Sequence, residues 1–369
     1  MPKNNSDTKQ IRKPPAQILR LLFMTLLEAF HPAGAAWVAL LAARGFSLAE
    51  VGLAEGAFHL TSLLFELPSG VLADVFGRKR SMVISQVAAI LSAVAMIGSD
   101  SLAGVCLAMV LSALGYNFTS GSREALAYEA LERAGREGEY DRYAAADLAL
   151  YRVGSAAGVL CAGLVLAWGH RRSYALDILV SAVGLGCALG LWEGRRPAPG
   201  GSALREMGRC LGESLAFLRE NRALLGLIFF NGAVGATATL LRFFLQARLT
   251  EGGLPAGLLG PALFLIGLGG VAGAWLVGRT RRWSFRRVCT LSALGVGACL
   301  GLSFLPGAWL LAVCGFAAAL LDDFLQIRFD VYVNERVPSG QRSTLLSVCS
   351  LCFSLIMIVL SPLLGALFS

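Results

Sequence analysis

Charged residues are scarce in this sequence of 369 residues. Asp, Glu, Lys and Arg make up 15% of it, whereas soluble domains contain about 25%. A water-soluble fold of this size would aggregate with so little charge on its surface. Hydrophobic residues reach 56% instead, and many lie in stretches of roughly 20 residues, the length that crosses about 30 Å of hydrocarbon. The composition therefore indicates an integral membrane protein, and it excludes a disordered chain, a secreted disulfide scaffold and a nucleic-acid binder.

Motifs that carry chemistry are also missing. The sequence has nine cysteines and three histidines, but no Cys/His cluster has the spacing of a zinc site. We interpret the thiols as small apolar packing groups. Neither a Walker A sequence nor an HExxH motif is present, which argues against an ATP-driven pump and a metalloprotease. We therefore expect a protein that is not an enzyme and that has no cofactor and no metal.

Charge, proline and glycine divide the sequence into apolar segments that predict eleven transmembrane helices. Six precede a polar stretch at 193–221 and five follow it. That stretch contains RRPAPGG and then leucines at helical spacing, so we interpret it as an amphipathic cytoplasmic linker. The expected fold is all-α, with an N-terminal bundle over 1–192 and a C-terminal bundle over 222–369. The expected spans are 17–43, 49–73, 81–99, 102–131, 143–168, 173–192, 222–247, 257–278, 287–304, 307–335 and 343–368.

Basic residues set the expected orientation. With the N-terminus inside, 24 of the 32 Lys and Arg residues fall on the cytoplasmic side and four on the outer side. This asymmetry is the one that short cytoplasmic loops show. We expect a multi-pass protein of the bacterial inner membrane, with the N-terminus and the linker in the cytoplasm. Eleven spans would place the C-terminus outside.

A loop motif joins the second and third expected spans. It reads Gly70-Val71-Leu72-Ala73-Asp74-Val75-Phe76-Gly77-Arg78-Lys79-Arg80. A topology signal would explain the three basic residues, but it leaves an acid and two glycines at fixed spacing unexplained. Gly70 lets two helices approach closely, and Gly77 permits a tight turn. The motif resembles the signature G-x-L-A-D-x-x-G-R-K-x of the major facilitator superfamily at every specified position.

The resemblance covers the whole chain and implies the two-bundle fold of that superfamily. In the family, the acid of this loop faces the N-terminus of the eleventh helix and latches the bundles in the outward-open state. Carried over by position, the latch is Asp74 against the helix that begins around Arg342. The other gating residues that the resemblance implies are Gly70, Gly77, Arg78, Lys79 and Arg80. A second copy at 273–282 has Val277 in place of the acid, as a fold of repeated halves allows.

Two partial signatures bear on the direction of transport, and one feature departs from the family. The fifth span carries Gly154 and Gly158 at the spacing of the antiporter motif, without its proline, and residues 118–131 resemble drug-efflux members. Leu111, however, stands where many proton antiporters place an arginine. Family members normally have twelve spans, so eleven imply that the twelfth is missing, through a shortened gene or a truncated sequence.

Ionisable side chains inside a membrane are costly, so each is a functional candidate. Adjacent aspartates at mid-depth are not expected to be ionised together, because like charges repel strongly in a low dielectric. Pro32 predicts a kink in the first span. The candidates for binding protons or substrate are Glu28, Glu55, His59, Arg242, Asp322 and Asp323.

The alternative interpretation of such residues is structural ion pairing. The pairs considered are Glu124 with Arg152 and Asp323 with Arg242. The residues assigned to structural pairing are Arg123, Glu124, Glu129 and Arg152.

We expect a monomeric secondary active transporter that exports a small amphiphilic or cationic solute in exchange for protons, by alternating access. Acids outnumber bases among the mid-depth candidates, which favours a cation. The expected partners are the solute, protons and the lipid bilayer, with no nucleic acid. Two alternatives stay open: uptake of a metabolite or nutrient on the same fold, and a receptor-like family member that transports nothing.

Overall fold

The computed structural model describes residues 16–193, 212, 216, 222–337 and 342–369, apart from the side chains of 67, 71, 74, 75 and 342–344. The described chain is helical and contains no strand. Most of the expected linker at 193–221 lies outside the described residues. The boundaries of the two expected bundles therefore stay a prediction.

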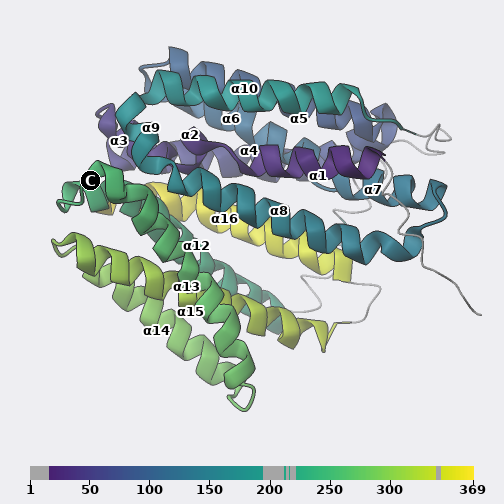
Figure 1. Ribbon diagram of the computed structural model, residues 1–369. Helices are drawn as coiled ribbons and strands as arrows, with labels where there is room; N and C mark the ends of the chain where they lie inside the picture. Colours follow the sequence, from purple (N-terminus) through teal and green to yellow (C-terminus); the bar gives the residue numbers. More distant parts are fainter. Residues whose placement is uncertain (1–15, 194–211, 213–215, 217–221, 338–341) are drawn as a thin grey trace, which may run out of the picture.

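The helices form two groups, which Figure 1 shows as α1–α10 and α12–α15, with α16 between them. The first group is α1 (Ala16–Ala29), α2 (Pro32–Ala35), α3 (Trp37–Ala43), α4 (Leu48–Phe76), α5 (Arg78–Gly98), α6 (Leu102–Thr119), α7 (Ser122–Arg133), η1 (Glu137–Glu139), α8 (Tyr140–Leu160), α9 (Ala162–Trp168) and α10 (His170–Leu189). The rest are α12 (Arg222–Glu251), η2 (Ala256–Leu258), α13 (Leu259–Arg279), α14 (Phe285–Leu302), α15 (Ala308–Asn334) and α16 (Arg342–Phe368).

The number of candidate membrane spans differs from the eleven expected. Among the described residues, nine helices are long and apolar enough to cross a membrane, and the pair α8 and α9, bent by 46°, makes a tenth. The remaining expected span, 17–43, is divided among α1, α2 and α3, none of which is long enough alone. These three helices follow one another along the bundle (Figure 1), so they occupy the path predicted for one continuous span.

Backbone chemistry explains why the first span is interrupted. Pro32 occupies the first position of α2, where its missing N–H and its fixed φ favour a new helix start. Asp177 of α10 then accepts hydrogen bonds from the free N–H groups of Ala33 (3.3 Å) and Gly34 (3.0 Å). A second break lies at Ala36, whose φ of −117° and ψ of 24° separate α2 from α3.

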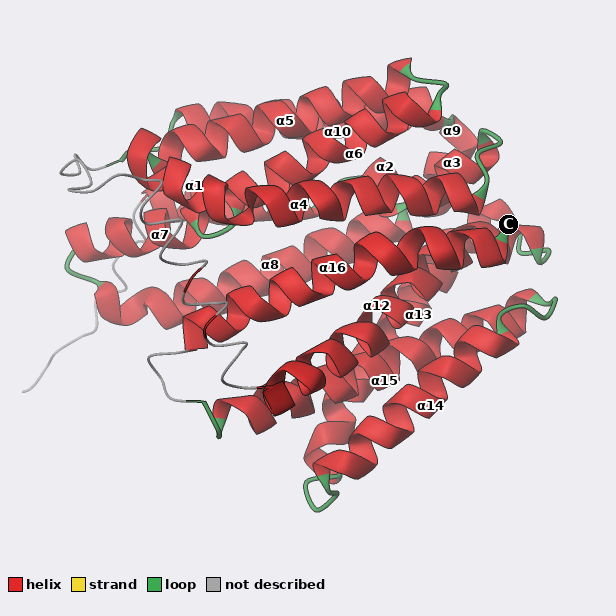
Figure 2. Ribbon diagram, turned by 180° about the vertical axis from the view of Figure 1, so that it is seen from behind, coloured by secondary structure: helices red, strands yellow, loops and turns green. Residues whose placement is uncertain are grey.

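The closest contacts between the two groups lie at one end of the molecule, which we call the packed end. It holds the end of α3, the start of α4 and the end of α16, where Ala49 N–H donates to Ser369 Oγ at 2.8 Å. A Cβ atom added at Gly52 of α4 would overlap a backbone carbonyl of α16, and one at Gly365 would overlap a carbonyl of α4. Gly260 of α13 meets Leu160 of α8 in the same way. Toward the opposite end, α14 and α15 diverge from α4 and α5 (Figure 2).

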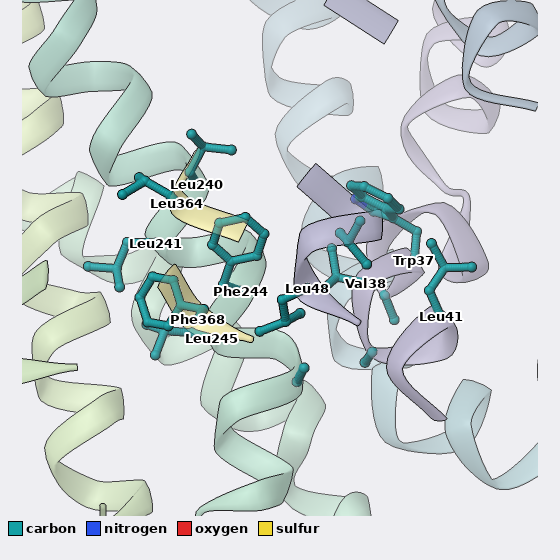
Figure 3. Close-up of a cluster of buried hydrophobic side chains, with 14 of the residues drawn as sticks. Trp37, Val38, Leu41, Leu48, Leu240, Leu241, Phe244, Leu245, Leu364 and Phe368 are labelled. Carbon is teal, nitrogen blue, oxygen red and sulfur yellow. The ribbon is translucent and has the colours of Figure 1, made fainter. Parts of the chain in front are cut away.

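Apolar side chains fill the packed end. Figure 3 shows Trp37 and Leu48 from the first group facing Phe244 of α12 and Phe368 of α16. Phe244 is 1% exposed and packs against Phe368, with ring centroids 5.4 Å apart. Lipid tails are as apolar as these side chains, so close packing rather than the hydrophobic effect stabilises this contact.

The glycine contacts at the packed end yield a test of the fold. Gly52→Ala forces backbone against backbone and should destabilise the protein by about 1–3 kcal/mol, the usual cost of overpacking. The measurement is the thermal unfolding midpoint of the purified protein in detergent. Gly56→Ala is the matched control, one turn further along α4, because its Cβ would meet its nearest neighbour at an ordinary 3.6 Å. Equal midpoints for the two variants would contradict the close α4–α16 contact.

Candidate functional site

The geometry of the loop at 70–80 depends on one glycine and one acid. Gly77 has a φ of 104°, which side chains other than glycine rarely adopt, and it separates α4 from α5. Glu193 accepts the first N–H groups of α5, from Arg78 at 2.5 Å and Lys79 at 3.2 Å. A carboxylate at this position complements the positive end of the helix dipole.

The contact expected to latch the two bundles involves side chains that the structure does not describe. The side chains of Asp74 and Arg342 lie outside the described residues, so their contact stays a prediction. Arg78 does form an ion pair within the first group of helices, at 2.7 Å from Glu129 of α7. Glu129 is therefore paired as expected of it, whereas Glu193, which caps α5, was not among the expected site residues. Its position just after the sixth span gave no signal of that contact.

A polar cluster, which we call the Glu28 cluster, connects four helices of the first group. It consists of Glu28, Arg123, Gln86, Thr25 and Asp147. Glu28 of α1 accepts hydrogen bonds from Arg123 of α7 and Gln86 of α5, each at 2.7 Å. Arg123 also donates to Thr25 at 3.1 Å, and Thr25 donates to Asp147 of α8 at 2.5 Å. The Glu28 and Arg123 side chains are 19% and 14% exposed, so this charge pair is largely removed from solvent.

The Glu28 cluster changes the expected pairing. Arg123 was expected to serve structural pairing and Glu28 to carry protons or substrate, yet the two form one ion pair. The expected pair of Glu124 and Arg152 is wrong for the described chain, where both side chains are exposed and no ion pair joins them. The break at Gly121, whose φ is 74°, explains the difference, because it starts α7 as a separate helix with Arg123 in its first turn.

Glu55 and His59 form a second pair, on the face of α4 that meets α16. Glu55 Oε1 lies 3.3 Å from His59 Nε2, and the two residues are 6% and 9% exposed. The His59 ring packs edge-on against Phe353 of α16, with centroids 5.7 Å apart. Further along the same stripe, Glu66 accepts a hydrogen bond from Ser350 of α16 at 3.0 Å. Glu55 and His59 are therefore buried between α4 of the first group and α16.

The two adjacent aspartates of α15 point to different neighbours. Asp322 lies 3.4 Å from Arg242 of α12. The carboxylate of Asp323 instead lies against the backbone of α13 at Gly270. Consecutive residues on a helix point about 100° apart, so one arginine does not face both. The expected pair of Asp323 with Arg242 is wrong, and Asp322 is the partner.

A pocket of about 320 Å³ opens between α12, α15 and α16. Asn231 donates to Gln326 at 2.8 Å, and Gln326 donates to Asp330 at 3.1 Å, which gives its wall a chain of hydrogen bonds. The lining residues are Ile228, Asn231, Gly232, Gly235, Thr239, Asp322, Asp323, Gln326, Phe329, Asp330, Leu346, Cys349, Ser350 and Phe353.

The pocket brings together some of the expected site residues and adds others. Asp322 and Asp323 line it, whereas Glu28, Glu55 and His59 lie elsewhere. Gln326 and Asp330 were not among the expected candidates. Their signal in the sequence is the spacing of four residues from Asp322, which places polar side chains on one face of α15. In the part of the chain that the structure describes, no group of three His, Cys, Asp or Glu side chains could hold a metal ion.

Comparisons with known proteins bear on the fold and the family. A sequence model of the Major Facilitator Superfamily matches residues 18–362. The chain is 35% identical over 88 residues to an uncharacterised MFS-type transporter, YxaM, of Bacillus subtilis strain 168. That match covers 24% of this chain and 22% of the relative, so it spans less than a quarter of the relative's length.

Solved structures are similar over nearly the whole chain. The nucleoside transporter NupG has a TM-score of 0.71 at 15% identity, covering 94% of this chain and 90% of that one. The peptide transporter POT, solved in complex with sulfate, has a TM-score of 0.65 at 14% identity, covering 95% and 88%. These likenesses confirm the fold class, and the sequence model over residues 18–362 confirms the family that the loop motif predicts.

The ion pair at the centre of the Glu28 cluster can be tested by mutation. Arg123→Gln leaves Glu28 without its counter-charge in a largely buried position, and losing one partner of such a pair typically destabilises a protein by about 3–5 kcal/mol. Glu28→Gln combined with Arg123→Gln removes both charges and should recover much of that loss. Unfolding midpoints of the two single variants and the double variant give the coupling energy. Strictly additive effects would show that the two side chains do not interact.

Proposed function

Because the chain belongs to the major facilitator superfamily, we propose that it is a secondary active transporter that exports a small amphiphilic cation in exchange for protons. Transport proceeds by alternating access, in which the two groups of helices open the central path first to one side of the membrane and then to the other. The groups correspond to the bundles predicted over 1–192 and 222–369, joined by the linker at 193–221, and a monomer is sufficient.

The acidic pocket in the second group of helices carries this proposal. Its volume of about 320 Å³ lies at the lower end of the usual range of small-molecule sites, about 300–1,000 Å³. Three carboxyl groups line it, and Arg242 pairs with only one of them. The lining also includes Phe329, Leu346 and Phe353. Carboxylates beside apolar side chains suit a cation that also carries an apolar part.

The carboxylate pairs supply a route for proton coupling. A proton on Asp322 removes the charge that holds Arg242, and it also removes a charge that would attract a cationic solute. Proton and solute therefore compete for the same carboxylate, and this competition is what an exchange mechanism requires. Glu28 with Arg123 repeats the arrangement in the first group of helices.

The conformation fits a transporter open to the cytoplasm. Under the orientation predicted from the basic residues, the packed end lies on the outer side of the membrane. The pocket is then reached from the cytoplasm, as loading for export requires. The loop at 70–80 and the start of α16 lie at the opposite end, where the latch through Asp74 would form once that end closes.

A second candidate function is uptake of a polar metabolite. The hydrogen-bonded chain of Asn231, Gln326 and Asp330 favours it, because neighbouring amide and carboxyl groups can bind the donors and acceptors of an uncharged solute. NupG and POT are named as nucleoside and peptide transporters. Drug-susceptibility assays and uptake assays in intact cells that lack their own pumps separate export from uptake.

The proposed coupling predicts a separation of two transport modes. In proteoliposomes with an imposed pH gradient, Asp322→Asn and Glu28→Gln should abolish accumulation of a lipophilic cation such as tetraphenylphosphonium. Counterflow of labelled against unlabelled solute needs no net proton movement, so at least one of these variants should retain it. Glu132→Gln, at an exposed acid outside the pocket, is the control and should behave as wild type.

The outcomes distinguish coupling from structural pairing. Loss of accumulation, counterflow and protein yield together would assign the carboxylate to structural pairing, because an unpaired buried charge destabilises the folded protein. Accumulation at the wild-type rate in both variants would show that neither carboxylate couples the pump.

A further inference from the structure

A side chain from the second group of helices is inserted into the backbone of the first span. In a continuous helix, Ala39 N–H would donate to the carbonyl of Ala35, four residues earlier. Here Ala39 N–H donates to Gln246 Oε1 at 3.4 Å, and Gln246 Nε2 donates to the Ala35 carbonyl at 3.2 Å. The Gln246 amide thus replaces the helical hydrogen bond between Ala39 N–H and the Ala35 carbonyl. It does so at the break that Ala36 makes between α2 and α3.

The surroundings of Gln246 make its two hydrogen bonds to the first span difficult to replace. Gln246 is 6% exposed, Ala39 is 3% exposed and Ala36 is fully buried. Trp37 beside the break packs edge-on against Phe243 of α12, with ring centroids 5.8 Å apart. Water has little access to Ala39 N–H, and a glutamine side chain supplies both the acceptor that this group needs and a donor for the Ala35 carbonyl.

The two interruptions of the first span are stabilised from different directions. Asp177, which binds the start of α2, belongs to α10 of the same group of helices. Gln246 belongs to α12, which lies in the other group and meets α3 at the packed end. Separation of the two groups at the packed end would leave the Asp177 contacts in place and remove those of Gln246.

From this geometry we propose that Gln246 is a clamp that acts in one conformational state. When the packed end is closed, the Gln246 amide keeps α2 and α3 separate at Ala36. When α12 moves away, Ala39 N–H and the Ala35 carbonyl bond to each other, and α2 and α3 become continuous. This inference rests on the proposed alternating access, but it requires neither a particular solute nor proton coupling.

Hydrogen–deuterium exchange of the full-length protein in detergent tests the clamp without any transport assay. Gln246→Leu keeps the approximate size of the side chain and removes both hydrogen bonds. Exchange at the packed-end residues 48–56 should become roughly tenfold faster, because the closed state is disfavoured, whereas Ala39 N–H keeps a partner in the Ala35 carbonyl once the clamp is released. Thr250→Val is the matched control on α12, since the Thr250 hydroxyl bonds only within its own helix.

A second variant keeps the test decisive if Gln246→Leu folds poorly. The carboxyl group in Gln246→Glu offers a donor and an acceptor when it is protonated, and only acceptors when it is ionised. Exchange over 48–56 should then be close to wild type in acid and faster as the pH rises, after correction for the intrinsic pH dependence of exchange. The wild-type protein should show no such additional pH dependence.

A double variant separates the clamp from a purely structural hydrogen bond. Gly52→Leu forces α4 and α16 apart and so opens the packed end. In that background Gln246→Leu should change exchange over 48–56 by less than twofold, because the clamp is already released. An equal effect in both backgrounds, unchanged exchange in Gln246→Leu, or a Gln246→Glu variant without the pH dependence would each overturn the proposal. Failure of transport assays alone would count against the proposed function and not against the clamp.

Discussion

Backbone polar groups inside a membrane must find partners within the protein, because hydrocarbon supplies none. This requirement governs the first span, which is broken after Ala29 and again at Ala36. Side chains from α10 and α12 bind the backbone groups that the breaks release. A helix can therefore be interrupted here only where a neighbouring helix offers a polar side chain at the same depth. The positions of the breaks in the first span therefore depend on how α10 and α12 pack against it.

Charged side chains obey the same requirement. Glu28 and Asp322 each lie beside an arginine on another helix, and Glu55 lies beside a histidine. Each carboxylate is tolerated because a partner compensates part of its desolvation. Pairing and transport do not exclude each other, because a proton or a cation can exchange for the partner. A structural ion pair and a coupling site can be the same group at different moments of a cycle.

The sequence predicts the helices well and the contacts of their side chains poorly. Ten of the eleven expected spans correspond to single helices or broken pairs, because hydrophobic length is a local property. Pro32 signals one break in the first span, but Ala36 signals nothing, since its interruption depends on Gln246, 210 positions later in the sequence. Arg123 was assigned to structural pairing without a partner, and its pairing with Glu28 depends on the turn at Gly121, which begins α7 as a separate helix. Partners on other helices are set by packing, which periodicity does not encode.

Glycine contacts make the packed end more rigid than side-chain packing alone would. Gly52 and Gly365 bring two backbones together without side chains between them, so the contact has little freedom to deform gradually. Packed interfaces of this kind tend to be either formed or separated. The Gln246 amide lies in the same region and joins the same groups of helices through α3 and α12. Because both contacts depend on one separation between the groups, opening the packed end should break them together, and this linkage would let a change at α12 reach the backbone of the first span.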